Sequence, residues 1–120
     1  MNDIKKNIMT TADELSNVAL LPSRYDLREK ERVTTVRNQG SYGTCWASAA
    51  LSAIESSLQP ENNVSYSVDH MSMSNSFDVE QNDGGSYTMA MAYLAAWQGP
   101  VYEKDDPYGD GESDDTLKEV

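Results

Sequence analysis

Cysteine and histidine are almost absent from this sequence, which has one of each, Cys45 and His70. A single cysteine cannot form an internal disulfide, so the chain is not a small secreted scaffold held by several bridges. No apolar run approaches the ~20 residues that a membrane span needs. Net positive charge is absent as well: the formal charge is −11. That acidity argues against a nucleic-acid partner, which would require a basic face.

Large apolar side chains are also scarce. Hydrophobic residues make up 38% of the 120 residues, and only one of them is Phe. The length suffices for about one domain. Its core should therefore be small.

Two segments have the pattern of amphipathic helices. Residues 44–58 follow a possible N-cap, Thr44, and stop at Gln59-Pro60. Residues 86–98 follow Ser86 and stop at Gly99-Pro100. The predicted apolar face of the first helix is Trp46, Ala50, Ala53, Ile54 and Leu58, and that of the second is Tyr87, Ala90, Met91, Leu94 and Trp97.

Shorter elements complete the pattern. The β-branched residues 33–36 predict a short strand, and residues 67–74 a short helix. Residues 82–85 read as a turn before the second long helix. The acidic end, residues 103–120, is expected to be loose. The order of these elements suggests a mostly helical unit.

The residues from Gln39 to Trp46 carry the chemical signal. A thiol is an effective nucleophile as the thiolate, and Cys45 is placed at the first turn of a predicted helix. Free N–H groups and the positive end of the helix dipole favour a negative sulfur there. The glycine-bearing loop before Cys45 could fold back and aim the Gln39 amide at a developing oxyanion. A lone cysteine is more often an inert buried thiol, and the register with Gln39, Gly43 and Trp46 favours the nucleophile.

This stretch resembles the papain family of cysteine peptidases, in which the cysteine lies in a C-G-[SA]-C-[WY] motif. Residues 42–46 read Tyr-Gly-Thr-Cys-Trp. The flanking segments 21–28, 33–40, 67–70, 82–85 and 99–108 also resemble parts of that family's domain, so the resemblance runs from about residue 21 to residue 109.

The resemblance implies an α+β papain-like fold with two lobes. The chain would cover the helical lobe, with the cysteine helix at its centre, and the β-rich lobe would be missing. Cys45 would be the nucleophile and Gln39 the oxyanion-hole donor, acting on a peptide or protein substrate without a cofactor. The implied substrate-binding residues are Gly43, Trp46, Gly84, Gly85 and Tyr87, although helical spacing alone places Trp46 in the core and favours packing for Tyr87.

Departures from the family concern its cysteines. Members commonly have a cysteine where Tyr42 stands, bonded to one where Asn82 stands, and another where Ser74 stands. Both ends of the first bridge are replaced together, which suggests a disulfide-free branch of bacterial type. The family suggests secretion or the cell surface, but residues 1–9 show no signal peptide.

The histidine that serves the family as general base follows the cysteine by about 130–150 residues. Only 75 residues follow Cys45 in this chain of 120, and His70 is 25 residues downstream. His70 is therefore expected to be a surface residue on the short helix. Three hypotheses remain open: an incomplete peptidase, inactive alone; a non-catalytic peptide-binding half-domain; and a half-enzyme completed by another chain or by the missing lobe. We favour the first.

The expected division of the chain is an N-terminal extension or propeptide remnant at residues 1–20, the lobe at residues 21–109 and a disordered acidic tail at residues 110–120. Calcium takes oxygen ligands, which the tail's carboxylates offer. Their spacing does not match an EF-hand, so we expect no metal site. The tail residues concerned are Asp105, Asp106, Asp110, Glu112, Asp114 and Asp115.

Overall fold

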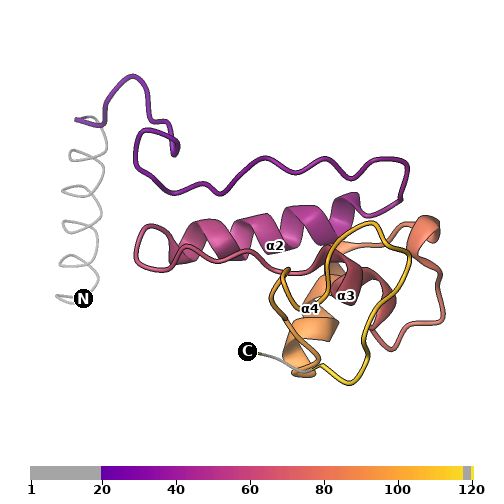
Figure 1. Cartoon of the computed structure of the whole chain (residues 1–120). Coiled ribbons are helices and arrows are strands. Elements are labelled where there is room, and N and C mark those ends of the chain that lie inside the picture. Colours follow the sequence, from indigo (N-terminus) through magenta and orange to yellow (C-terminus); the bar gives the residue numbers. More distant parts are fainter. Residues whose placement is uncertain (1–19, 118–119) are drawn as a thin grey trace, which may run out of the picture.

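The computed structural model describes residues 20–117 and residue 120, so most of the expected N-terminal extension lies outside the described residues. Its regular elements are helical (Figure 1): α2 (Cys45–Leu58), α3 (Val68–Met73), the 3-10 turn η1 (Gln81–Asp83) and α4 (Tyr87–Ala95). Between residues 20 and 117 there is no β-strand, only an isolated antiparallel bridge between Tyr66 and Tyr102.

Both long helices and the short one were predicted from the sequence, and α2 and α3 have the expected bounds to within a residue or two. The buried face of α2 agrees in part with the prediction. Its buried residues are Trp46, Ala47, Leu51 and Glu55, whereas Ala53 is exposed. Four of the five predicted residues do lie at the core, since Trp46 is buried and Ala50, Ile54 and Leu58 are partly buried against it. An acidic side chain is rarely buried without partners, so apolar periodicity could not include Glu55.

The predicted face of α4 is right for Ala90 and Leu94, which lie at the core, and wrong for its other three residues. Ala90 and Tyr93 are buried, whereas Tyr87, Met91 and Trp97 are exposed. Nearly every residue of α4 is apolar, so periodicity could not select the face. The helix ends at Ala95 rather than Gln98, because Trp97 adopts a positive φ of 59°.

Trp97 occupies the left-handed position of a helix-ending motif that usually holds glycine. The N–H of Gln98 donates to the Tyr93 carbonyl (3.2 Å) and that of Trp97 to the Leu94 carbonyl (3.1 Å). A side chain with a Cβ is strained in this conformation by roughly 1–2 kcal/mol.

Replacing Trp97 with glycine should therefore give a protein about 1 kcal/mol more stable than Trp97→Ala, since both lose the indole and only glycine relieves the strain. The free energy of unfolding would be measured in urea at constant m-value. Ala92→Gly, at an exposed position inside α4, is the matched control and should lose about 1 kcal/mol. Equal stabilities of Trp97→Gly and Trp97→Ala would contradict the strain.

The core lies where α3 and α4 gather at the N-terminal end of α2 (Figure 1). Each helix contributes buried apolar side chains, and Tyr66 joins them from the preceding loop. The members of this cluster are Trp46, Ala47, Leu51, Tyr66, Val68, Met71, Ala90 and Tyr93. Since Trp46 and Ala47 directly follow Cys45, the core fixes the start of α2.

Residues 20–44 run back along α2 before turning into it (Figure 1). The predicted strand at residues 33–36 is wrong, because this segment has no neighbouring strand within the described part of the chain. Side chains hold it instead. The buried carboxylate of Glu55 accepts hydrogen bonds from Thr34 Oγ1 (2.8 Å), from the Tyr66 N–H (2.8 Å) and from Arg37, with which it forms an ion pair.

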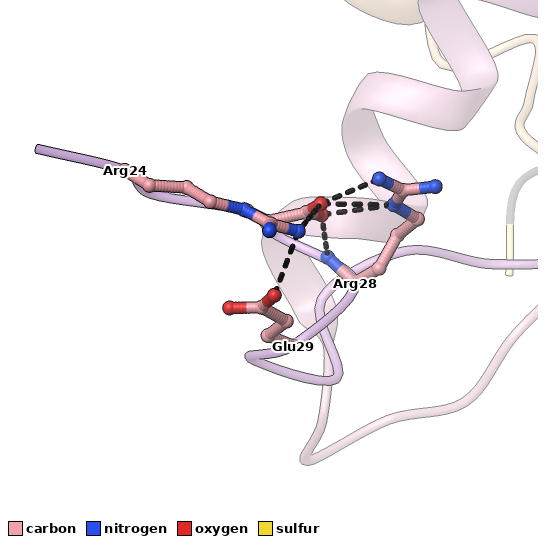
Figure 2. A network of polar contacts seen from close by, with 4 residues as sticks. Arg24, Arg28 and Glu29 are labelled. Atoms are coloured by element: carbon pink, nitrogen blue, oxygen red, sulfur yellow. Dashed lines mark hydrogen bonds and ion pairs between the residues drawn. The ribbon is translucent and has the colours of Figure 1, made fainter.

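An exposed ion-pair network lies at the beginning of this segment (Figure 2). Arg24 and Arg28 converge on the carboxylate of Asp26, and Arg24 also pairs with Glu29 at 2.8 Å. Hydrogen bonds from Arg28, first from its side chain and then from its backbone, hold the pKa of Asp26 well below its usual range. Exposed pairs of this kind add little stability. The network joins residues 24–29 to one another and does not attach them to the helices.

Among the described residues, no helix has the length and apolar character required to span a membrane.

Candidate active site

Cys45 is the first residue of α2, and its side chain is exposed. Thr44 stands at the N-cap as predicted, but its side chain makes no capping hydrogen bond. The first hydrogen bond of α2 runs from the Ser48 N–H to the Thr44 carbonyl (3.0 Å). The N–H groups of residues 45–47 therefore have no acceptor within the helix. An exposed thiol at this end of a helix lies where negative charge is favoured.

The loop before Cys45 is closed on itself. The Gln39 amide nitrogen donates to the Tyr42 carbonyl (2.8 Å), and the Tyr42 N–H lies 3.4 Å from the Gln39 carbonyl oxygen. The loop does fold back, as expected, with Gln39 half-buried at its base. Since an amide nitrogen carries two N–H groups, the Tyr42 contact leaves Gln39 a second donor.

Gly43 brings this loop against the glycine pair. A Cβ at Gly43 would lie 2.8 Å from the Asn82 carbonyl oxygen and 3.2 Å from the Gly84 nitrogen. The Gly43 N–H also donates to Asn82 Oδ1 at 3.4 Å. Two segments about 40 residues apart are thus in backbone contact beside Cys45, and only glycine permits this approach.

Gly85 makes a second close contact, with the indole of Trp46. A Cβ at Gly85 would lie 2.5 Å from Trp46 Cε2, and the Trp46 side chain is buried. The missing Cβ of Gly85 is therefore explained by packing on Trp46. Spacing placed Trp46 in the core, and this is where it lies.

Gly84 and Tyr87 face open space. A Cβ at Gly84 would meet no atom within 4 Å, but its φ of 77° favours glycine. Tyr87 is 76% exposed, so it does not pack in the core. The structure thus brings together Gly43, Trp46, Gly84 and Gly85 around the start of α2, with Tyr87 at the exposed beginning of α4.

Tyr108 is a site neighbour that the sequence did not single out for a role. Its hydroxyl donates to the Gln39 carbonyl (2.5 Å) and lies 2.8 Å from Thr44 Oγ1. Its ring meets that of Tyr42 edge to face, with centroids 5.8 Å apart. The only sequence signal was its place in the family-like segment 99–108, which gave it no function.

Two carboxylates hold the chain around Tyr108. The Tyr108 N–H donates to Glu103 Oε1 (2.8 Å), and the next N–H, of Gly109, donates to Asp69 Oδ2 (3.0 Å). Burial raises the pKa of both carboxyl groups, and these hydrogen bonds oppose the rise. Residues 103–109 are thus attached to the lobe, whereas the domain limits and the disorder of residues 110–120 stay predictions.

His70 does not lie on the surface, so that prediction was wrong. It is 1% exposed on α3, with ring Nδ1 2.6 Å from the Tyr93 hydroxyl. The error arose because α4 presents Tyr93 rather than its predicted face to α3. A buried imidazole at this position is not at the surface where Cys45 lies.

Three carboxylates, one on α3 and two in the segment after residue 103, lie close together, a feature that the spacing of acidic residues did not predict. Oxygens of Asp69, Asp106 and Asp110 lie within 4.8 Å of one another. The two buried members already accept hydrogen bonds, Asp69 from Gln81 (2.7 Å) and Asp106 from Ser113 (2.8 Å). Both buried carboxylates thus have protein donors, and the expected absence of a metal site stays a prediction.

A cavity of about 360 Å³ lies behind the loop, lined by residues 34–39 and by Ser48, Val68, Glu103 and Tyr108, among others. Cys45 does not line it. The cavity therefore lies between residues 34–39 on one side and residues 63–65, Val68, Glu103 and Tyr108 on the other, away from the thiol.

Comparison with known proteins places these features in one family. The family model described as "Papain family cysteine protease" matches residues 21–119. The senescence-specific cysteine protease SAG12 of Arabidopsis thaliana is 35% identical over 92 residues, which are 73% of this chain and 26% of that protein. Mouse cathepsin O is 38% identical over 84 residues, which are 67% of this chain and 26% of that protein. The chain thus spans about a quarter of the length of these relatives.

Solved structures agree with the sequence matches. The protease and lectin-like domains of Cwp84, a surface layer associated protein of Clostridium difficile, superpose with a TM-score of 0.65 at 30% identity, covering 74% of this chain and 22% of that one. A structure from work on the mite allergens Blo t 1 and Der p 1 gives 0.64 at 30% identity, covering 78% and 34%. The expected papain-like fold class is confirmed. The relatives include plant, animal, viral and bacterial proteins, so a specifically bacterial branch stays a prediction.

Proposed function

This chain belongs to the papain family of cysteine proteases, and on that premise we propose that it is part of a cysteine-type endopeptidase whose nucleophile is Cys45. The observation that carries the proposal is the exposed Cys45 side chain at the first residue of α2, a helix whose first N–H groups receive no side-chain cap. This position stabilises a thiolate through the helix dipole and the free N–H donors.

In the proposed reaction, the Cys45 sulfur attacks the carbonyl carbon of a peptide bond, and the carbonyl π electrons move to the oxygen. The resulting oxyanion accepts hydrogen bonds from the second N–H of the Gln39 amide and from the backbone N–H of Cys45. When the carbonyl re-forms, the C–N bond breaks and the amine leaves with the proton that the thiol gave up. Water then attacks the thioester, which releases the acid and returns the thiol.

The proposed reaction also needs a general base to carry the thiol proton, most often a histidine. The only histidine of these 120 residues, His70, is buried on α3 beside Tyr93. We propose that a histidine outside this chain takes the thiol proton and gives it to the leaving amine. The 120 residues alone would then be inactive, whether the base lies further along the same protein or on a second chain.

The glycine pair and Tyr87 are the proposed substrate contacts. The backbone of Gly84 is open to solvent on the side where a Cβ would stand, so an extended peptide can approach its N–H and carbonyl groups. Tyr87 offers an exposed ring a few residues further on. Gly43 and Trp46 would support these contacts indirectly, since each touches the segment that carries the glycine pair.

Labelling with a peptidyl vinyl sulfone tests the proposal on the full-length protein. We expect one adduct, located on Cys45 by mass mapping, with hydrolysis of a fluorogenic peptide lost in parallel with labelling. The Cys45→Ala variant is the control and should take up no label. Hydrolysis that persists at full labelling, or that is lost while Cys45 stays unmodified, would rule out Cys45 as the nucleophile.

A further inference from the structure

The Gln39–Thr44 loop has no covalent support, because Cys45 is the only cysteine of the chain. Its two ends nevertheless converge on one atom. The Tyr108 hydroxyl oxygen lies 2.5 Å from the Gln39 carbonyl oxygen and 2.8 Å from Thr44 Oγ1. Tyr108, which follows the loop by more than 60 residues in the sequence, thus joins the first and last residues of the loop.

Hydrogen-bond roles in this bridge follow from counting donors. A phenol has a single O–H hydrogen, and the Gln39 carbonyl can only accept, so that hydrogen lies toward Gln39. Thr44 must then donate its own hydroxyl hydrogen to the Tyr108 oxygen. Thr44 is fully buried, so no solvent competes for this bond. The Thr44 side chain makes no capping hydrogen bond to α2.

Tyr108 is itself held in place from three sides. Its N–H is fixed by Glu103 and the following N–H by Asp69, and its ring packs against Tyr42. These contacts hold the backbone at Tyr108 and one side of its ring. The phenol sets the separation between Gln39 and the N-terminus of α2, the two sources of oxyanion donors in the proposed mechanism.

We propose that Tyr108 is a positioning residue for the oxyanion site, acting through its hydrogen bond to Gln39 and its contact with Thr44. The inference rests on the proposed function, since it needs Gln39 as an oxyanion donor. Small errors in the placement of such a donor lower the rate of the chemical step more than the affinity for substrate.

Tyr108→Phe in the full-length protein removes the hydroxyl and keeps the ring against Tyr42. We expect kcat for a fluorogenic peptide to fall about tenfold, with KM changed less than twofold. Alkylation of Cys45 by iodoacetamide, which forms no oxyanion, should change less than twofold. In a Gln39→Ala background the same substitution should change kcat less than twofold, because the residue it positions is gone.

Tyr93→Phe is the matched control, since it also deletes a buried phenol hydroxyl, the one beside His70. It should lower thermal stability without changing kcat. Equal kcat losses for Tyr108→Phe in both backgrounds, or no loss beyond that of Tyr93→Phe, would overturn the positioning role. If Tyr108→Phe does not fold, Thr44→Val applies the same two-background test to the other bond. The proposed function has a separate test: it would be wrong if Cys45→Ala retained hydrolysis, whatever the result for Tyr108→Phe.

Discussion

Replacing Cys45 with alanine in the full-length protein is expected to abolish peptide hydrolysis, with kcat falling by roughly four to six powers of ten. Alanine keeps the start of α2 but removes the atom that would form the acyl intermediate. Because Cys45 is exposed and makes no core contact, folding should be unaffected. Turnover of a fluorogenic peptide and the thermal midpoint would be measured on the same samples.

Substrate binding should survive this change, since the proposed peptide contacts are backbone groups near Gly84. Fluorescence anisotropy of a non-cleavable peptide should give a Kd within a few fold of the wild-type value. Ser48→Ala is the control, because it also removes a polar side-chain group one turn further along α2. It should retain full activity. Residual hydrolysis above about 1% of wild type in Cys45→Ala would place the nucleophile elsewhere.

The helices could be predicted from the sequence because their signals are local. Thr44 and Ser67 stand at N-caps, and Ser67 Oγ does accept a hydrogen bond from the His70 N–H. Gln59-Pro60 ends α2 where expected. Such boundaries depend on backbone chemistry within a few residues, so no knowledge of the tertiary structure was needed.

Faces and partners could not be predicted in the same way. Residues 33–36 have β-branched side chains, but a strand needs a neighbouring strand, and Glu55 of α2 holds this segment instead. The buried side of α4 depends on Tyr93 meeting His70. Each of these outcomes is decided by a contact between distant segments, and tertiary contacts override local pattern.

The candidate site also combines features that are local in the sequence with contacts between distant segments. The nucleophile and Gln39 were identified from one short motif, and their roles stay predictions. The contacts of Gly43 with Asn82 and of Gly85 with Trp46 join residues about 40 positions apart. Glycines at 43 and 85 were visible in the sequence, but the atoms that require them were not. The sequence therefore indicated which residues matter, and the structure supplies what they touch.

Gln39→Ala in the full-length protein is expected to lower kcat by about a hundredfold or more, because an oxyanion donor is typically worth roughly 3–4 kcal/mol of barrier. The amide would act only once negative charge develops on the carbonyl oxygen. KM and the Kd of a non-cleavable peptide should therefore stay within about twofold, as expected for an interaction made only in the transition state. Steady-state kinetics and anisotropy would measure the two quantities.

The amide's second contact provides the check on this interpretation. Gln39 also donates to the Tyr42 carbonyl, so its loss could loosen the loop as well as remove the donor. Gln39→Glu retains the length of the side chain but has no N–H to offer, and it should lose at least as much rate as Gln39→Ala. Gln98→Ala removes an amide that donates to Ser76 beyond the far end of α4, and it should leave kcat unchanged. A silent Gln39→Ala, or a loss that appears only in KM, would remove Gln39 from the oxyanion site, because a donor that acts on the transition state must affect kcat.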